Sequence, residues 1–317
     1  MESLVSSNSS AVPPSLLIPG WALPRGGVTT EADAAFAAGC ALGLLDGLVR
    51  SDPIWAGCWR QRLTLKCAVS AVKLLGWNEE EAALRDAVLL TSPGDSPGPA
   101  GSVLVAYRRL AGGTRVIDTK TLRELCTLLS VGWDELLADI PSLVDDLLQA
   151  NRAAPFIVAD LATRIVTLRP DAEVLAWWLA DWVLAQKLRW PRPVPLLMAE
   201  RYGPAFRTIG GRGRMLPGDD GFHRAVCIAL AQGTSEALRM AGEIERRADH
   251  MLKVSGKVRT KGASAVIRQL LDDDAVVVSA PGTNLSRWAS RRLFERLESL
   301  GGVRELSGRQ SFRIFGL

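Results

Sequence analysis

The sequence predicts a mainly α-helical protein that ends in a short β-hairpin. Its 317 residues are 48% hydrophobic, enough for a large core, but only 6% are aromatic. Alanine, leucine and arginine fill the long periodic segments, and such a composition favours helices over strands. The end of the chain supplies the second observation, because one helical pattern is followed there by two short runs, VREL and SFRIF.

The most informative stretch runs from residue 283 to residue 317. Apolar residues recur there at helical spacing, namely Leu285, Trp288, Ala289, Leu293, Leu297 and Leu300. The remaining faces carry four arginines, Arg287, Arg291, Arg292 and Arg296. We therefore expect one amphipathic helix with a basic side. Gly301 and Gly302 end this helix, because glycine adopts a left-handed cap at little steric cost. The two runs that follow form a hairpin with Arg309 at its tip.

This order of helix and hairpin is typical of a winged-helix module, in which the helix faces a DNA groove and the hairpin is the wing. Residues 263–271 predict a short helix and residues 275–279 a strand, matching the first helix and strand of such a module. Only residues 280–283 separate the strand from the basic helix, so the second helix of a complete module is missing or vestigial. Since that helix braces the recognition helix, its loss argues against base-specific DNA binding. The alternative is a winged-helix-like packing or dimerisation module with a solvated arginine face.

The basic character of the chain is concentrated at this end. From Lys253 onward there are 12 Lys and Arg against 6 Asp and Glu, whereas the first 252 residues hold 26 against 28. Such asymmetry suits an anionic partner, nucleic acid first. The predicted contacts to duplex DNA are Arg287, Arg291, Arg292, Arg296 and the wing residue Arg309.

We expect three parts: an irregular N-terminal arm at residues 1–29, a helical body at residues 30–254 and the winged-helix-like domain at residues 258–317. The body helices are predicted at residues 30–50, 53–76, 78–90, 102–110, 119–129, 133–140, 142–150, 155–168, 171–190 and 220–254. The segment 91–101 is rich in proline and glycine and is predicted as a loop. Three tryptophans of the segment 171–190, Trp177, Trp178 and Trp182, are predicted to lie in the core.

Residues 190–221 form the longest irregular stretch, and such stretches in compact domains are often functional. Two glycines precede Arg212, and a third separates it from Arg214. Backbone amides and guanidinium groups in such a segment can form an anion-binding loop. The stretch lacks the Walker lysine and the spacing of a dinucleotide fingerprint, so we interpret it as a mobile basic loop, with the anion-binding loop as the alternative.

No catalytic motif is found in the sequence. The two histidines, His223 and His250, stand 27 residues apart, which excludes a close pair of histidine ligands. Asp219 and Asp220 precede His223, and we interpret them as helix N-terminal acids rather than metal ligands. We expect no cofactor and no metal. Five scattered cysteines without a CxxC pair favour a reducing, cytoplasmic setting, and the most apolar run is too short for a membrane span.

Several strings resemble an uncharacterised bacterial family, the domain-of-unknown-function family 1403. They are RSDPIWAGCWRQRL, EAALRDAVLLTSPGDSPGPAG, LRWPRPVPLL and RRLFERLESLGGVRELSGRQSFRIFGL. This resemblance covers nearly the whole chain and implies a bacterial, often plasmid-borne setting without a known activity.

The ending ELSGRQSFRIFGL is also similar to the winged-helix tails of some Fic-type proteins, whose core is helical. Their catalytic signature is His-Pro-Phe followed by a glycine-rich anion loop. The nearest string here is LPGDDGFHR, with Leu216 in place of the histidine before Pro217. The similarity therefore implies that adenylyl transfer is lost.

The leading hypothesis is a nucleic-acid-binding, regulatory protein that acts through a degenerate winged helix. A second hypothesis is an enzyme on a Fic-like or other helical scaffold, with its site near the loop 207–224. A third is a structural or partner-binding protein.

Overall fold

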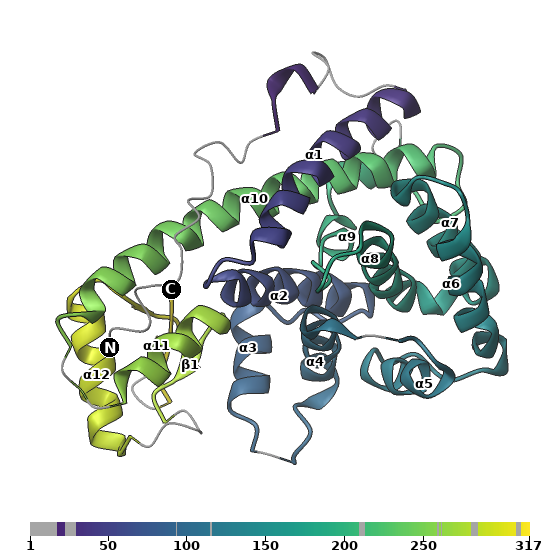
Figure 1. Ribbon diagram of the computed structural model, residues 1–317. Helices are drawn as coiled ribbons and strands as arrows, with labels where there is room; N and C mark the ends of the chain where they lie inside the picture. Colours follow the sequence, from purple (N-terminus) through teal and green to yellow (C-terminus); the bar gives the residue numbers. More distant parts are fainter. Residues whose placement is uncertain are drawn as a thin grey trace. The chain divides into compact units, whose positions relative to one another are not determined.

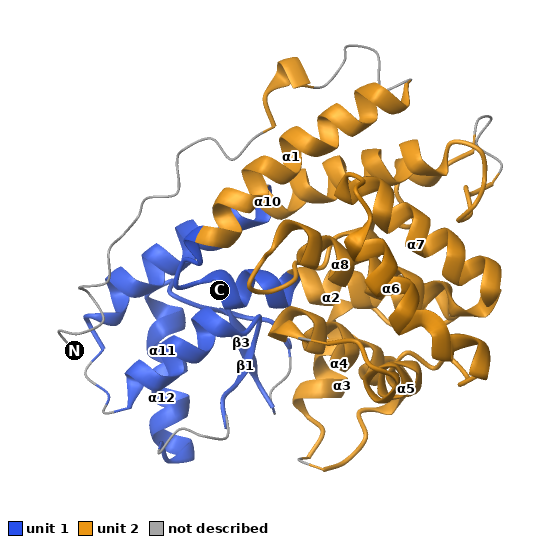
Figure 2. Ribbon diagram, turned by 45° about the vertical axis from the view of Figure 1, so that its right-hand side comes forward, with its two compact units in different colours: residues 1–16, 51–62, 239–317 blue, residues 17–50, 63–238 orange. Residues whose placement is uncertain are grey.

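The computed structural model of the chain describes residues 18–22, 30–92, 94–114, 116–208, 213–258, 260, 262–279, 285–308 and 312–317. The chain divides into two compact units (Figure 2). Unit 1 includes Ser51–Arg62 and Arg239–Leu317, and unit 2 consists of Leu17–Arg50 and Leu63–Leu238. The predicted C-terminal domain falls within unit 1, whereas the predicted body is divided between the units. Most of the predicted N-terminal arm lies outside the described residues.

Helices dominate the described part of the chain (Figure 1), as predicted. The α-helices are α1 (Glu31–Ser51), α2 (Ala56–Leu74), α3 (Glu81–Leu89), α4 (Gly98–Gly113), α5 (Thr119–Leu128), α6 (Ile140–Gln149), α7 (Ala154–Leu168), α8 (Glu173–Leu188), α9 (Leu197–Glu200), α10 (Phe222–Ser255), α11 (Ala263–Asp272) and α12 (Arg287–Ser299). Short 3-10 helices are formed by Gly20–Ala22, Glu135–Asp139, Pro170–Ala172 and Pro204–Phe206. The strands are β1 (Val276–Val277), β2 (Arg304–Glu305) and β3 (Ile314–Gly316).

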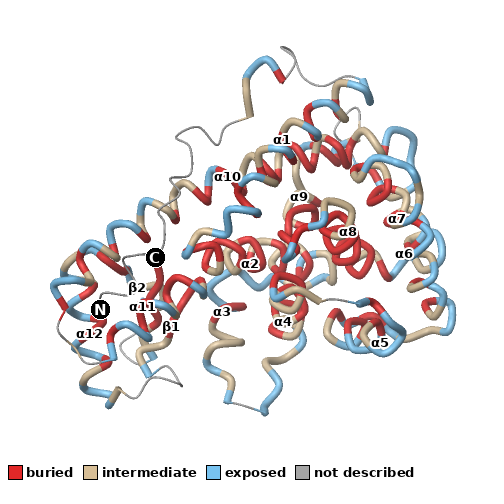
Figure 3. The backbone as a smooth tube through the Cα atoms, viewed as in Figure 1, coloured by how far each residue is buried: buried red, intermediate tan, exposed pale blue. Residues whose placement is uncertain are grey.

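Helix α8 forms the centre of unit 2, and Figure 3 shows it buried along most of its length. Apolar residues occur on every side of this helix, so none of its faces is suited to solvent exposure. The tryptophan N–H groups are nevertheless satisfied: Trp178 donates to the Ala106 carbonyl at 2.9 Å and Trp182 to the Thr114 carbonyl at 2.7 Å. The prediction that these tryptophans belong to the core is confirmed.

A carboxyl group is also buried in α8. Asp181 is fully buried and accepts hydrogen bonds from the backbone N–H groups of Leu196 (2.9 Å) and Leu197 (3.1 Å). Burial raises the pKa of Asp181 to about 7, although both hydrogen bonds favour the charged form and oppose the shift. This residue thus fixes the chain that follows α8 to the helix itself.

Helix α1 has the length and apolar composition of a membrane span, with a mean hydropathy of 1.5 in a window of which 44% is buried. A buried core helix of a soluble protein can have the same length and apolar composition. The buried residues of α1 recur at helical spacing, and Ala37 and Ala41 pack with Ala231 of α10 inside unit 2. The small alanine side chains allow these two helices to approach closely.

Unit 1 contains the only sheet of the described residues. The order of elements is α11, β1, α12, β2, β3, and the antiparallel sheet has the strand order β1-β3-β2. Phe315 of β3 lies opposite both Val276 of β1 and Glu305 of β2. The predicted short hairpin at the end of a mainly α protein is therefore confirmed. Its assignment as a winged helix stays a prediction.

Close backbone packing holds unit 1 together. A Cβ atom on Gly57 of α2 would lie 2.6 Å from the Cα atom of Asp272, and one on Gly316 would lie 2.5 Å from the Asp274 carbonyl oxygen. Arg62 and Arg247 each donate a hydrogen bond of 3.1 Å to the Leu317 carbonyl oxygen. The first turns of α2 are thus tied to α11 and β3.

Three predictions of local structure were wrong. Residues 98–101 do not belong to a loop, because α4 already begins at Gly98 with Pro99 in its first turn. The backbone N–H groups of a first turn have no acceptor within the helix, so proline is tolerated there. The helix predicted at residues 133–140 is a 3-10 helix, Glu135–Asp139, before α6. The stretch 190–221 is partly regular, since it contains α9 and a 3-10 turn, and residues 193–198 are buried.

Candidate functional site

Helix α12 presents an exposed basic face. Arg287, Arg291, Arg292 and Arg296 are all exposed, as is Trp288 at 73%. At 100° per residue, Trp288 lies at the middle of the arc that these four arginines span. We call these five residues the arginine face.

The opposite side of α12 is buried in unit 1. Ser290, Leu293, Phe294 and Leu297 are buried, and the Phe294 ring stacks on Phe315 of β3 with 4.9 Å between ring centroids. Ser286 caps the helix by accepting a hydrogen bond from the Ala289 N–H at 3.3 Å. The sheet therefore fixes which side of α12 faces outward.

The sequence-based placement of Trp288 was wrong. We expected it on the apolar side with Leu293 and Leu297, but the structure places it among the arginines. Trp288 and Leu297 are nine residues apart, which is two and a half helical turns, so they point to opposite sides of the helix.

The arginines differ in how free they are to bind an anion. Arg291 donates a hydrogen bond of 2.8 Å to Glu295, one turn further along the helix. Arg287, Arg292 and Arg296 form no ion pair with a residue that the structure describes. Three charged guanidinium groups are thus available beside the exposed indole ring.

The sequence also predicted anion contacts by Arg309, Arg212 and Arg214. Arg309 and Arg212 lie outside the described residues. Arg214 packs its guanidinium group 4.6 Å from the Tyr202 ring centroid and donates to the Arg201 carbonyl at 3.3 Å. On the hairpin, Arg313 is held by Glu298 and Glu305, which makes it a structural residue.

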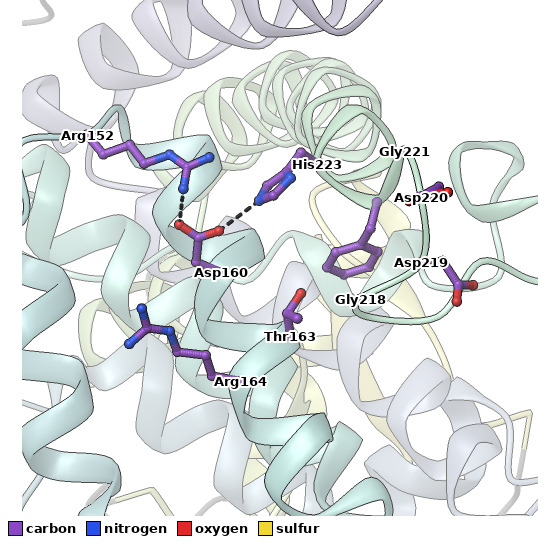
Figure 4. A pocket seen from close by; sticks show the side chains of 10 residues that line it. Arg152, Asp160, Thr163, Arg164, Gly218, Asp219, Asp220, Gly221 and His223 are labelled. Carbon is purple, nitrogen blue, oxygen red and sulfur yellow. Dashed lines mark hydrogen bonds and ion pairs between the residues drawn. The ribbon is translucent and has the colours of Figure 1, made fainter.

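Unit 2 contains a separate hollow, which we call the polar pocket, with a volume of about 400 Å³ (Figure 4). Helix α7 supplies Asp160, Thr163 and Arg164 at i, i+3 and i+4 spacing, so they share one side of the helix. Arg152 precedes α7, and His223 lies in the first turn of α10. The loop 218–221, which precedes α10, completes the lining of the pocket.

Asp160 organises the polar pocket. Its Oδ1 atom lies 2.7 Å from His223 Nε2, and its Oδ2 atom lies 2.5 Å from a guanidinium nitrogen of Arg152. Phe156 supports both partners, since its ring centroid lies 5.2 Å from the Arg152 guanidinium and 6.0 Å from the centre of the His223 ring, which it meets edge-on. These contacts fix a carboxylate between a histidine and an arginine.

Asp219 and Asp220 do not join His223 in a metal site. In Figure 4 their side chains turn away from Asp160, and the Asp219 carboxylate accepts a hydrogen bond of 2.7 Å from the Leu216 N–H. Within the described ranges, no three histidine, cysteine or acidic side chains come together as metal ligands. All five cysteines are free, and four of them are buried.

Sequence reasoning missed most of the polar pocket. Phe156, Asp160 and Arg164 recur every four residues on one side of a predicted helix, and this was the available signal. Their partner His223 is 63 residues from Asp160, so the contact depends on the tertiary fold.

Comparison with known proteins agrees with the strings that resemble a family. The chain matches the family described as "Protein of unknown function (DUF1403)" over residues 5–317. The chain belongs to this family. No curated protein matches the chain. The DUF1403 family has no assigned activity, so membership fixes no function for the arginine face or the polar pocket. The similarity of the tail to Fic-type proteins stays a prediction.

Proposed function

We propose that this DUF1403 protein binds duplex nucleic acid through the arginine face of α12. The observation that carries the proposal is the combination of four exposed arginines with one exposed tryptophan on a helix whose other side is buried. Basic side chains attract phosphates irrespective of sequence, and an aromatic ring beside them adds stacking or wedge contacts.

The surrounding elements support this mode of binding. The succession α11, β1, α12, β2, β3 with strand order β1-β3-β2 supports the proposal, because a winged helix also places a strand after its first helix and a hairpin after its recognition helix. Nine residues separate β1 from α12, and residues 280–284 among them lie outside the described part. Because the sequence leaves too few residues for a complete bracing helix before α12, we expect contacts to the DNA backbone rather than base-specific recognition.

The experiment is a fluorescence anisotropy titration of a labelled random-sequence DNA duplex at several salt concentrations. Wild-type protein should bind at low salt, and its affinity should fall steeply as salt rises. The double variant Arg292→Ala/Arg296→Ala should bind about ten-fold more weakly, with a salt slope lower by about two.

The matched control is Arg192→Ala/Arg268→Ala, which removes the same charge from two exposed arginines outside α12. It should retain wild-type affinity. The proposal is wrong if wild-type protein shows no affinity at low salt, or if the control weakens binding as much as the α12 variant.

A further inference from the structure

The lining of the polar pocket carries two guanidinium groups, Arg152 and Arg164, and the carboxylates of Asp160, Asp219 and Asp220. Asp160 is the acidic side chain at its centre, and that carboxylate is already shared by Arg152 and His223. The carboxylates of Asp219 and Asp220 turn away from it (Figure 4). Within the described residues, Arg152 is therefore ion-paired with a carboxylate of the pocket, whereas Arg164 is not.

Arg164 is the available cation of this site. It is exposed and forms no hydrogen bond or ion pair with any residue in the described part of the chain. Figure 4 shows its guanidinium group and that of Arg152 on either side of Asp160 along α7. Arg152 uses one terminal nitrogen for Asp160 and keeps further N–H groups, since a guanidinium has five.

The donors of the pocket have different geometries. Two planar guanidinium groups, the His223 imidazole and the Thr163 hydroxyl surround a volume of about 400 Å³, within the usual range for small-molecule sites. A carboxylate offers two oxygens in one plane, which a single guanidinium satisfies. A phosphate monoester offers three terminal oxygens in three directions and can use several of these donors together.

We propose that the polar pocket binds the phosphate group of a small phosphorylated molecule, with Arg164 as its principal partner and Arg152, His223 and Thr163 as additional donors. Asp160 is a positioning residue, because it holds Arg152 and His223 without contacting the ligand. The proposal rests on unit 2 alone and does not depend on DNA binding by α12.

The two histidines of the chain make a direct test possible. We would label the full-length protein with ¹⁵N-histidine and follow the imidazole signals during titration with inorganic phosphate, at constant pH and with ionic strength balanced by chloride. The signal of His223 should shift and saturate. His250, in unit 1, contacts the Leu300 carbonyl at 3.0 Å and serves as an internal reference that should not move. A His250→Asn variant assigns the two signals.

Variants establish which residues bind the phosphate. Arg164→Gln should weaken the phosphate-dependent shift of His223 by at least about ten-fold, because a charge-assisted hydrogen bond is lost. Arg192→Gln removes an exposed arginine of the same unit outside the pocket and should titrate like the wild type. Unchanged histidine signals before titration show that each variant is folded.

Further probes separate the chemical classes. Glycerol 3-phosphate should shift His223 at lower concentrations than inorganic phosphate if the natural ligand is a phosphorylated molecule, and acetate should shift it little. The proposal is overturned if phosphate leaves His223 unchanged, if acetate acts as strongly as phosphate, or if Arg164→Gln titrates like the wild type.

Discussion

Helices α8 and α12 both carry tryptophan, but the two helices use it in opposite ways. Trp178 and Trp182 of α8 are 0% and 4% exposed, and each indole N–H donates to a backbone carbonyl. Trp288 of α12 is 73% exposed and lies between arginines. An indole ring stabilises a fold only when its area is removed from water and its N–H is paired. The exposed ring therefore adds little to stability, which is why we include it in the proposed DNA-binding surface.

The two helices also differ in whether their charged groups are buried or exposed. Helix α8 buries one carboxyl group, Asp181, and satisfies it with two backbone N–H groups. Helix α12 leaves its arginines in water, where an ion pair such as Arg291–Glu295 contributes little. The comparison teaches that burial, rather than residue type, separates the side chains that stabilise this fold from those that remain in water.

The largest effect is expected from the tryptophans themselves. Trp182→Ala should lower the free energy of unfolding by about 3 to 5 kcal/mol, because it leaves a cavity and an unpaired Thr114 carbonyl. Trp288→Ala is the matched control, and it should change stability by less than about 0.5 kcal/mol while weakening DNA binding. Denaturant unfolding of both variants measures the difference. Equal losses of stability would break the distinction between the two helices.

A smaller effect is expected from the buried carboxyl group. The pKa of Asp181 is raised to about 7 in the folded protein, above its value near 3.8 in the unfolded chain. Its contribution to stability is therefore fully present below pH 4 and is lost as the pH rises through 7. Between pH 5 and pH 8.5 the melting temperature of the wild type should fall as the pH increases.

Asp181→Asn should flatten this pH dependence. The variant should also be less stable by about 1 to 3 kcal/mol at pH 5, because an amide NH₂ then faces one of the N–H donors. Burial raises the pKa of Glu200 as well, so part of the slope should remain. A slope identical to that of the wild type would show that Asp181 does not titrate in this range.

The smallest change in DNA affinity is expected from Glu295 of α12. Glu295→Gln frees Arg291 and removes a negative charge from the arginine face, so DNA affinity should rise by about two- to three-fold. Stability should not change measurably. Glu79→Gln removes the same charge at an exposed position outside α12 and should leave DNA affinity unchanged. Anisotropy titrations of the two variants decide whether the effect is local.

Helical periodicity predicted most of the fold, because α8, α10 and α12 have long regular patterns that local physics determines. It failed at the start of α4, where proline was taken as a helix breaker although it suits a first turn. It also misplaced Trp288, because this residue was grouped with the apolar side by its hydrophobicity and not by its angular position on the helix. The contact between His223 and Asp160 in the polar pocket could not be predicted, because it forms only after α7 and α10 have packed.

The two glycines of unit 1 have a consequence for sequence variation within the family. Gly57 and Gly316 are required for space, because even a methyl group would collide with the backbone at Asp272 or Asp274. A saturation mutagenesis screen for folded protein should therefore show two positions where alanine is as harmful as a charged residue. Family members that carry larger residues at both positions must have separated the start of α2 from α11 and β3 from the residues that follow α11.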